Sequence, residues 1–229
     1  TTNKNTIIAN NYKMLKIDTL DNQPLPEKIV EKIERIIKKD KSSAIIFSDF
    51  RHGFFNKVSI PRFCSSIGSG VFKAADSQVA TRWGNILDYK NFNLITPNER
   101  EARFSLADQD SGIGDLARGL KKNSTYRNLI LKLGERGIFV DGSENNSSIY
   151  FSLPSFTNHI VDNNGSGDAL LAYSSLTLKV SGSIVMASII GSIAASGECE
   201  LEGNIPISSI NIIEKIESIK NETRYKFQK

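Results

Sequence analysis

The amino-acid sequence predicts an α/β domain, a three-layer sandwich in which helices cover both faces of a mostly parallel sheet. Short apolar runs, such as 44–47 and 128–133, alternate with segments of helical periodicity, which is typical of such sheets. No repeat, low-complexity tract or Pro/Gly/Ser-rich linker divides the 229 residues, so we expect one domain over 1–229. Two cysteines and the lack of a long apolar run indicate a cytoplasmic protein without a membrane segment.

The first half of the chain predicts an N-terminal β-pair followed by alternating strands and helices. Two apolar segments around an Asn-Asn turn form the pair, and two prolines introduce the helix after it. Each later strand is a short apolar run bounded by polar or glycine-containing segments. The expected elements are strands at 6–9 and 12–18, a helix from Glu27, a strand at 44–47, a helix at 58–67, strands at 71–75 and 94–96, helices from Asn98 and at 113–122, and a strand at 128–133.

The second half of the chain predicts one hairpin and then helices only. A polar loop, SENNS, joins the two strands of the hairpin at 137–142 and 148–153. Glycine and proline separate the segments of helical periodicity that follow. The expected helices, with Gly182 and Pro206 between them, cover 167–179, 183–196 and 208–219.

The net charge of +4 does not indicate a surface for nucleic acid. Residues 27–41 hold six basic and four acidic side chains, and residues 213–229 hold five basic and three acidic, so these two segments account for the whole excess. In both segments isoleucines recur at helical spacing between charges of alternating sign, which is typical of amphipathic helices with a solvated face. We therefore expect neither nucleic acid nor a membrane as partner.

The strongest local pattern is DNNGSGDALLAY at 162–173. Gly165, Ser166 and Gly167 form a small-residue turn that leads into an apolar helix, and the free N–H groups there suit an anion. Asp168 follows this turn. A carboxylate there repels phosphate, so its presence indicates a chemical role, such as taking a proton from a hydroxyl that attacks a phosphoryl group. The alternative is that Asp168 only charges the helix start, since short glycine patterns recur by chance.

Two further patterns follow predicted strands. In LITPNERE, Asn98 and Glu101 have the spacing of a capping box, and they also suit a metal–phosphate group held through water. In LKLGERG, Gly134 and Gly137 allow a tight turn close to a ligand. Taken singly, the first is better explained by a helix cap and the second by a plain turn between strands.

Two aspartates and two histidines complete the set of candidates. Asp49 and Asp76 are expected at carboxyl ends of strands, where ligands of parallel sheets bind, and are candidates for the substrate side. His52 and His159 are the only histidines and have no partners at metal-ligand spacing, so a zinc site is not expected. The sequence contains no P-loop motif and no serine-hydrolase elbow.

Taken together and in order, T-P-N-E-R-E, K-L-G-E-R-G and D-N-N-G-S-G-D resemble the motifs of the ribokinase-type (phosphofructokinase-B) carbohydrate kinases. Those kinases have an N-P-N-x-x-E-like segment, a T-x-G-x-x-G-like turn and a late D-T-x-G-A-G-D motif. SDFRHG (48–53), VFKAAD (71–76) and NFNLITPNEREA (91–102) are most similar to the heptose-phosphate kinase branch. The resemblance implies a Rossmann-like, ribokinase-like fold from about residue 6 to 220.

The resemblance also implies an activity and its cofactors: transfer of the γ-phosphate of ATP to a hydroxyl of a sugar or sugar phosphate, with Mg²⁺ and, in some members, K⁺. It implies that Asp168 is the general base and that the backbone of Gly165, Ser166 and Gly167 is the anion hole. The remaining matches are Asn98, Glu101 (Mg²⁺, through water), Lys132, Gly134, Gly137 and Ser192 on the nucleotide side, and Asp162 and Asn164 in a loop that helps some members bind a monovalent cation.

The chain departs from the family pattern in several places. Lys132 stands where members often have Thr or Ser, and Ser192 where many have Asn. After the strand at 71–75 the heptose branch has D-P-K, with a lysine that faces phosphate, whereas Asp76-Ser77-Gln78 lacks that cation; Arg82 is a candidate replacement. The G-D-x-x-x-D-like strand and the Gly-Gly-x-x-N segment that bind sugar are not found, so we expect a kinase domain lacking its N-terminal segment.

Two alternatives to a sugar kinase remain open. One is a nucleotide-binding fragment or module that is catalytically incomplete. The other is a nucleoside or vitamin kinase of the same fold. In each case the expected partners are small molecules, together with a second copy of the chain bound through the N-terminal β-pair region.

Overall fold

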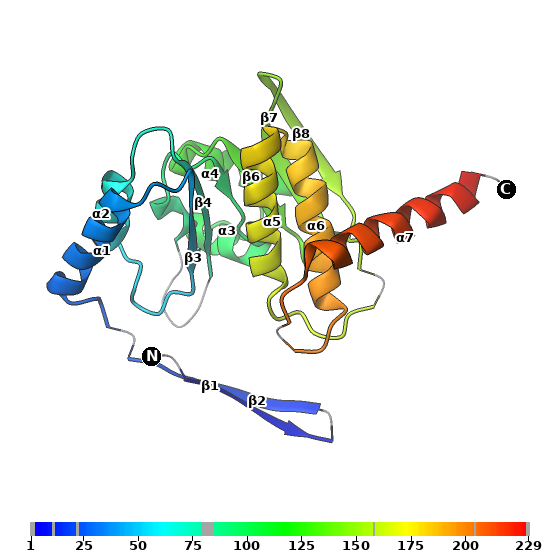
Figure 1. Cartoon of the computed structure of the whole chain (residues 1–229), viewed down its shortest axis with the longest axis horizontal. Helices are drawn as coiled ribbons and strands as arrows, with labels where there is room; N and C mark the ends of the chain where they lie inside the picture. The colour runs from blue at the N-terminus through cyan, green and yellow to red at the C-terminus, as the bar shows by residue number, and fades with distance from the viewer. Residues whose placement is uncertain are drawn as a thin grey trace.

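Six strands form the central sheet of the molecule, and they lie side by side in chain order (Figure 1). The computed structural model describes residues 3–227 except 11, 22, 79–84, 158 and 204. The first four strands are parallel, and the last two are antiparallel to their neighbours. This confirms the mostly parallel sheet that the sequence predicts. The strands are β3 (Ala44–Asp49), β4 (Phe72–Ser77), β5 (Leu94–Ile95), β6 (Asn128–Lys132), β7 (Ile138–Glu144) and β8 (Ser147–Leu153).

Helices cover both faces of this sheet, because consecutive strand residues face opposite sides. In β4, Ala74 belongs to one apolar core and Ala75 to the other; in β6, Ile130 and Leu131 divide in the same way. The core of Ala75 and Leu131 is closed by α1 (Glu27–Lys39), α2 (Ser59–Ser66), η1 (Ile86–Asp88), α3 (Glu99–Leu106) and α4 (Ile113–Ser124). The opposite core is closed by α5 (Ser166–Ser181) and α6 (Ile184–Cys199).

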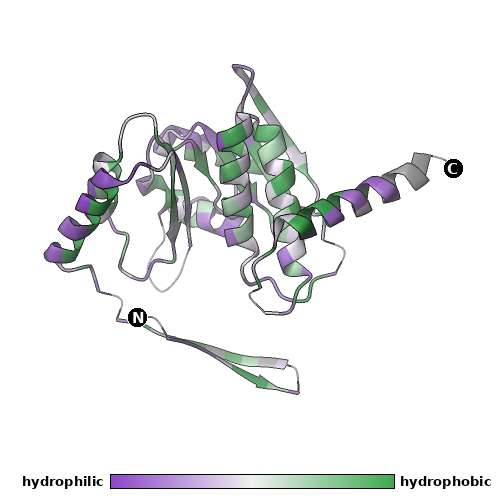
Figure 2. Ribbon diagram, viewed as in Figure 1, coloured by the Kyte–Doolittle hydropathy of each residue, from purple (hydrophilic) through white to green (hydrophobic). Residues whose placement is uncertain are grey.

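The helix α6 is apolar on more than one side, and two separate apolar clusters cover it. Ile184 and Ala187 pack in the core beneath the sheet, whereas Ile193 and Ala194 pack in a third cluster. The last helix, α7 (Ser209–Phe227), contributes Ile212 to that cluster before it extends away from the body (Figures 1 and 2). The result is a three-layer sandwich with an additional helix on its outer side.

A hairpin of two antiparallel strands, β1 (Asn3–Ala9) and β2 (Tyr12–Thr19), stands apart from the sandwich (Figure 1). It is the β-pair that the sequence predicts. Its apolar side chains are left uncovered: Ile8 is 58% exposed, Tyr12 76% and Met14 66%. Figure 2 shows these apolar segments on a ribbon with no second layer over it.

The predicted elements differ from the observed ones mainly at their ends. β4 runs through Ser77, so Asp76 lies inside a strand and not after it. The hairpin of β7 and β8 turns at Asn145 and Asn146, with φ of 48° and 63°, instead of through a longer polar loop, because asparagine tolerates left-handed backbone. Within the described residues, no helix combines the length and the apolar character needed to cross a membrane.

Candidate functional site

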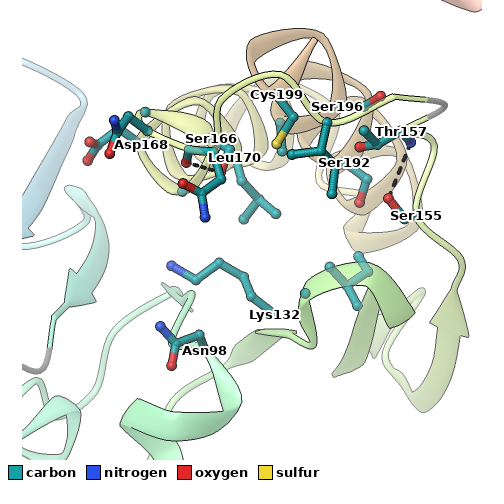
Figure 3. Close-up of a pocket in the computed structure, with 18 of the residues that line it drawn as sticks. Asn98, Lys132, Ser155, Thr157, Ser166, Asp168, Leu170, Ser192, Ser196 and Cys199 are labelled. Carbon is teal, nitrogen blue, oxygen red and sulfur yellow. Dashed lines mark hydrogen bonds between the residues drawn. The ribbon is translucent and has the colours of Figure 1, made fainter. Parts of the chain in front are cut away.

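A cavity of about 870 Å³ opens at the carboxyl ends of the parallel strands, which is ample for a nucleotide with a small acceptor (Figure 3). Its walls come from the ends of β4 and β6, the start of α5, one side of α6, the segment after β8 and the start of β1. All three sequence patterns therefore reach one space. The predicted site residues that line it are Asp76, Asn98, Glu101, Lys132, Gly134, Gly137, Asn164, Gly165, Ser166, Gly167, Asp168 and Ser192.

The glycine turn before α5 presents bare backbone to this cavity. Gly165 is the N-cap, with a left-handed φ of 86° that favours glycine. The N–H groups of the next residues have no partner within the helix, as at any helix start. A Cβ atom on Gly167 would lie 3.4 Å from Lys132 Nζ, so a side chain there would press on the lysine. The turn therefore offers N–H donors close to a cation.

Asp168 lies in the first turn of α5 and lines the cavity. Its Oδ1 accepts a hydrogen bond of 3.1 Å from the Ser48 hydroxyl of β3. The carboxylate is thereby held by the sheet on which α5 packs. Ser48 was missed by the sequence analysis: it lies 120 positions away, and an isolated serine in a strand carries no signal of its partner.

Asn98 and Glu101 form the predicted capping box at the start of α3. The Asn98 N–H donates to Glu101 Oε2 at 2.7 Å, the Asn98 amide donates to Oε1 at 2.7 Å, and the Glu101 N–H donates to Asn98 Oδ1 at 2.8 Å. Glu101 is 5% exposed. Burial raises the pKa of Glu101 to about 7, with the Asp76 carboxylate adding repulsion and Lys132 and the Asn98 donors opposing the rise. This carboxyl group therefore titrates near neutral pH.

Lys132 ends β6 and points into the space between Asn98 and the turn of α5 (Figure 3). Its N–H donates to the Pro97 carbonyl at 2.9 Å, which joins the second sequence pattern to the third. Its ammonium donates to Asp76 Oδ2 at 2.6 Å, and the two side chains are only 17% and 7% exposed. Burial alone would lower the pKa of Lys132, but the carboxylates of Asp76, Glu101 and Asp168 raise it overall. Lys132 is therefore a stable cation.

The far end of the cavity is formed by α6 and the turns around β7. Gly137 has a φ of 84°, and a Cβ atom there would lie 2.1 Å from the Leu153 carbonyl oxygen. Glycine is thus required by the close passage of the chain after β8, which forms the wall with Ser155 and Thr157 (Figure 3). Ser192 lines this end from α6, and in the described part of the chain its buried hydroxyl has no hydrogen-bond partner.

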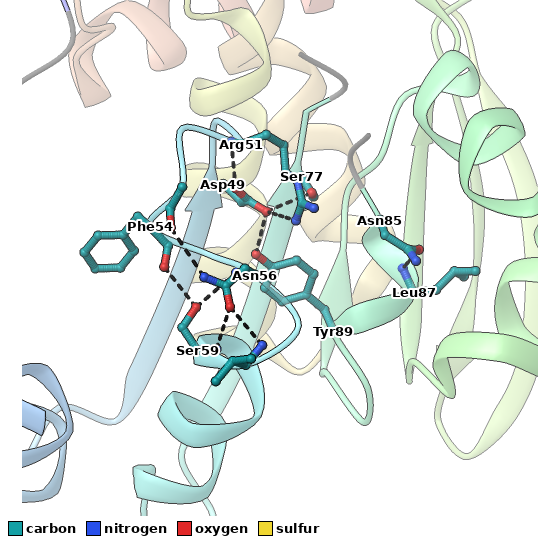
Figure 4. A network of polar contacts seen from close by, with 11 residues as sticks. Asp49, Arg51, Phe54, Asn56, Ser59, Ser77, Asn85, Leu87 and Tyr89 are labelled. Atoms are coloured by element: carbon teal, nitrogen blue, oxygen red, sulfur yellow. Dashed lines mark hydrogen bonds and ion pairs between the residues drawn. The ribbon is translucent and has the colours of Figure 1, made fainter. Parts of the chain in front are cut away.

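Asp49, predicted for the substrate side, does not line the cavity. It is 2% exposed, and its carboxylate accepts from the Arg51 N–H at 2.7 Å, the Arg51 guanidinium at 3.0 Å, the Ser77 hydroxyl at 3.0 Å and the Tyr89 hydroxyl at 2.9 Å (Figure 4). Burial, reinforced by this carboxylate, raises the pKa of Tyr89. Asp49 is therefore saturated by internal donors. Arg82, the candidate replacement for the missing lysine of the D-P-K pattern, lies outside the described residues.

Asp162 and Asn164, the predicted monovalent-cation loop, lie beside the glycine turn. The Asn164 N–H donates to Asp162 Oδ1 at 3.1 Å, and its side-chain amide donates to Oδ2 at 3.3 Å. Asn164 lines the cavity, whereas Asp162 is 7% exposed beneath it. Among the residues that the structure describes, no three His, Cys, Asp or Glu side chains are grouped so as to hold a metal ion.

Comparison with known sequences identifies relatives at about a quarter identity. The chain is 26% identical over 179 residues to the bifunctional protein HldE of Wolinella succinogenes, a match that covers 75% of this chain and 36% of that protein. It is 26% identical over 235 residues to HldE of Campylobacter jejuni subsp. jejuni serotype O:6, with coverage of 99% and 46%. The chain is a homologue of HldE. It spans less than half the length of these curated relatives, and no family model matches it.

Comparison with solved structures identifies the fold. Phosphofructokinase-2 from Escherichia coli matches with a TM-score of 0.72 at 16% identity, over 90% of this chain and 67% of that one. Ribokinase from Thermotoga maritima matches with a TM-score of 0.71 at 17% identity, over 95% and 70%. The chain has the ribokinase-like fold. With the HldE homology, this confirms the resemblance that the three motifs suggest.

Proposed function

We propose that this chain is a carbohydrate kinase that transfers the γ-phosphate of ATP to a hydroxyl of a sugar or sugar phosphate. The observation that carries the proposal is the placement of Asp168 beside the bare N–H groups of the α5 turn, facing the cavity. A general base and an anion hole at one point are what a hydroxyl attack on a phosphoryl group requires. The fold and the HldE homology support the same assignment.

In this proposal each residue has a distinct part in the transfer. Asp168, held by Ser48, takes the proton of the acceptor hydroxyl as its oxygen attacks the γ-phosphorus. The N–H groups of Gly165, Ser166 and Gly167 stabilise the phosphoryl oxygens while the bond to ADP breaks. Gly134, Gly137 and Ser192 bind the nucleotide at the far end of the cavity.

The charges around the α5 turn suit a divalent cation. Asp76, Glu101, Asp168 and Lys132 interact electrostatically, and when all are ionised the three carboxylates and one ammonium leave a formal charge of −2 before any phosphate arrives. Asn98 and Glu101 would orient Mg²⁺ through water, and the ion would neutralise the nucleotide phosphates. Asp162 and Asn164 are proposed to border a K⁺ site; the E. coli phosphofructokinase-2 structure is a complex with potassium.

The acceptor and the assembly belong to the same proposal. Because the motifs at 48–53 and 71–76 resemble the heptose-phosphate branch, a heptose phosphate is the first acceptor to test.

The exposed apolar side chains of Ile8 and Tyr12 suit a homodimer through β1 and β2, which sedimentation would reveal. A tetrameric form is known for E. coli phosphofructokinase-2. We assign residues 1–229 to a single kinase domain and, since ATP is the donor, place it in the cytoplasm.

The Asp168→Asn variant tests the proposal directly. We expect its rate of ADP release with the best acceptor to fall by about 10²–10⁴, because the base is lost while the shape is kept. Asp115→Asn, an exposed aspartate of α4 paired with Arg118, is the matched control and should retain the wild-type rate. Near-normal turnover in Asp168→Asn would remove the carboxylate from the base role.

Calorimetry and an acceptor panel separate the two alternatives. Binding of Mg–ATP without transfer to any acceptor would support a catalytically incomplete module. Transfer to nucleosides or vitamins, with none to heptoses or hexoses, would support a different kinase of the same fold.

A further inference from the structure

Lys132 is the cation of the cavity at its phosphate end. Among the described residues that line the cavity, the cationic side chains are Lys4 and Lys132. Lys4 belongs to β1, where its ammonium lies 5.0 Å from the centre of the Phe50 ring. Lys132 Nζ instead lies 3.4 Å from the Cβ position of Gly167, at the turn whose N–H groups face the cavity. An oxyanion bound by that turn would therefore also meet this ammonium.

The ammonium of Lys132 is held in place from two sides. Its backbone is fixed to the Pro97 carbonyl, and its Nζ is bonded to Asp76 Oδ2 at 2.6 Å. Asp76 lies within β4, which is paired on both sides by β3 and β5, so its carboxylate is attached to backbone held in the sheet. An ammonium fixed in this way needs little reorganisation when negative charge develops beside it, and this is the condition under which electrostatic catalysis is strongest.

We propose that Lys132 is a catalytic residue whose ammonium donates to the transferring phosphoryl group, and that Asp76 is the positioning residue that holds it there. This inference rests on the proposed kinase function. The acceptor oxygen forms the bond to the γ-phosphorus, the bond from that phosphorus to the β-phosphate oxygen breaks, and the acceptor proton goes to Asp168. Lys132 stays protonated throughout and stabilises the charge on the transferring oxygens.

A purely structural role for Lys132, as counter-ion of buried carboxylates, makes a different prediction. In that case removing both members of the ion pair should cost less than removing Lys132 alone, because Asp76 is not left as a buried carboxylate without its cation; Glu101 still loses the attraction of Lys132. The double variant Asp76→Asn/Lys132→Met keeps the volume and removes both charges. It separates the two roles even if Lys132→Met alone fails to fold.

The experiment measures turnover and nucleotide preference in the same set of proteins. We expect the double variant to unfold within a few degrees of wild type, yet to lose about 10²–10³ in kcat. Its preference for Mg–ATP over Mg–ADP, measured by calorimetry, should fall about tenfold or more, because the ammonium contacts only the γ-phosphate. Asp76→Asn alone should lower the same preference by misplacing the ammonium, an effect that a merely structural carboxylate would not have. Lys121→Met, a partly exposed lysine 3.8 Å from Asp141, is the control and should change neither quantity.

Each outcome bears on the inference separately from the proposed function. A folded double variant with near-wild-type kcat and unchanged ATP preference would overturn the role of Lys132, while loss of activity in Asp168→Asn would still support the kinase. If wild type transfers phosphate to no acceptor, the kinase proposal fails and the catalytic role of Lys132 fails with it; the ATP-over-ADP preference then tests only the contact of the Lys132 ammonium with the γ-phosphate. A preference that is absent in wild type or unchanged in the variants overturns it.

Discussion

Two buried aspartates at the ends of neighbouring strands have opposite surroundings. Asp49 of β3 and Asp76 of β4 each pair with a cation, Arg51 at 3.0 Å and Lys132 at 2.6 Å. Asp49 accepts further bonds from Ser77 and Tyr89 inside the fold, and its region is closed. Asp76 lines the cavity, and its lysine lies beside the α5 turn. Asp49 is in register with Ser77 and Asp76 with Ser48, so the two side chains face opposite sides of the sheet; one builds the fold and the other faces the ligand space.

Burial and ion pairing alone therefore do not identify a functional carboxylate. What separates the two is where the partner cation lies. Arg51 lies two residues after Asp49 and donates to it from the same loop. Lys132 belongs to another strand, β6, and donates to Asp76 beside the cavity.

Asp49→Ala should destabilise the protein strongly with little effect on turnover per folded molecule. The change leaves the Arg51 guanidinium and the Tyr89 hydroxyl without their buried acceptor, which costs about 3–5 kcal/mol for a broken buried pair. Urea unfolding measures the loss, and Asp115→Ala on the surface should stay within about 0.5 kcal/mol of wild type. If kcat per folded molecule falls as far in Asp49→Ala as in Asp168→Asn, Asp49 is not purely structural and the difference between Asp49 and Asp76 is refuted.

Glu101 should make stability depend on pH near neutrality. Its pKa is raised from 4.5 to about 7 in the folded state, so the folded protein binds this proton more tightly than the unfolded chain. The stabilisation is fully present below pH 4.5 and is lost as pH rises through 7, by roughly 3 kcal/mol in total. Unfolding of the Mg²⁺-free protein between pH 4.5 and 8 measures it. Glu101→Gln should reduce the slope of the profile in this window and Glu99→Gln should not, and Asp76, whose pKa burial also raises, contributes to the slope that remains. Equal slopes in both variants would refute the assignment.

Ser48→Ala should have the smallest effect, and on the rate alone. It removes the 3.1 Å hydrogen bond to Asp168 Oδ1, so the carboxylate is less well oriented, and kcat should fall about three- to tenfold. Ser42→Ala is the matched control, since Ser42 also donates to an aspartate, Asp40, but does so on the surface. If both variants keep the wild-type kcat, Ser48 has no part in positioning Asp168.

Much of the candidate site follows from local pattern. The turn at 165–167, the capping box of Asn98 and Glu101 and the glycines of 131–137 were predicted as separate features, and the structure brings them to one cavity. The rule that ligands bind beyond the carboxyl ends of parallel strands was enough to expect this. The same rule made Asp49 a substrate-side candidate; the structure places it outside the cavity, because it faces the side of the sheet opposite to Asp76 and meets internal donors there.

The sequence by itself determined the elements, their order and the layers, because apolar period, glycine and asparagine turns and helix caps act over a few residues. It also determined the positions of the polar residues along the strands. Only the tertiary structure decided which of them are partners: Ser48 with Asp168, Lys132 with Asp76, and Arg51, Ser77 and Tyr89 with Asp49. These pairings depend on strand register and on the packing of α5 against the sheet. No local pattern encodes those distances, because a hydrogen bond between remote residues exists only after the layers have packed.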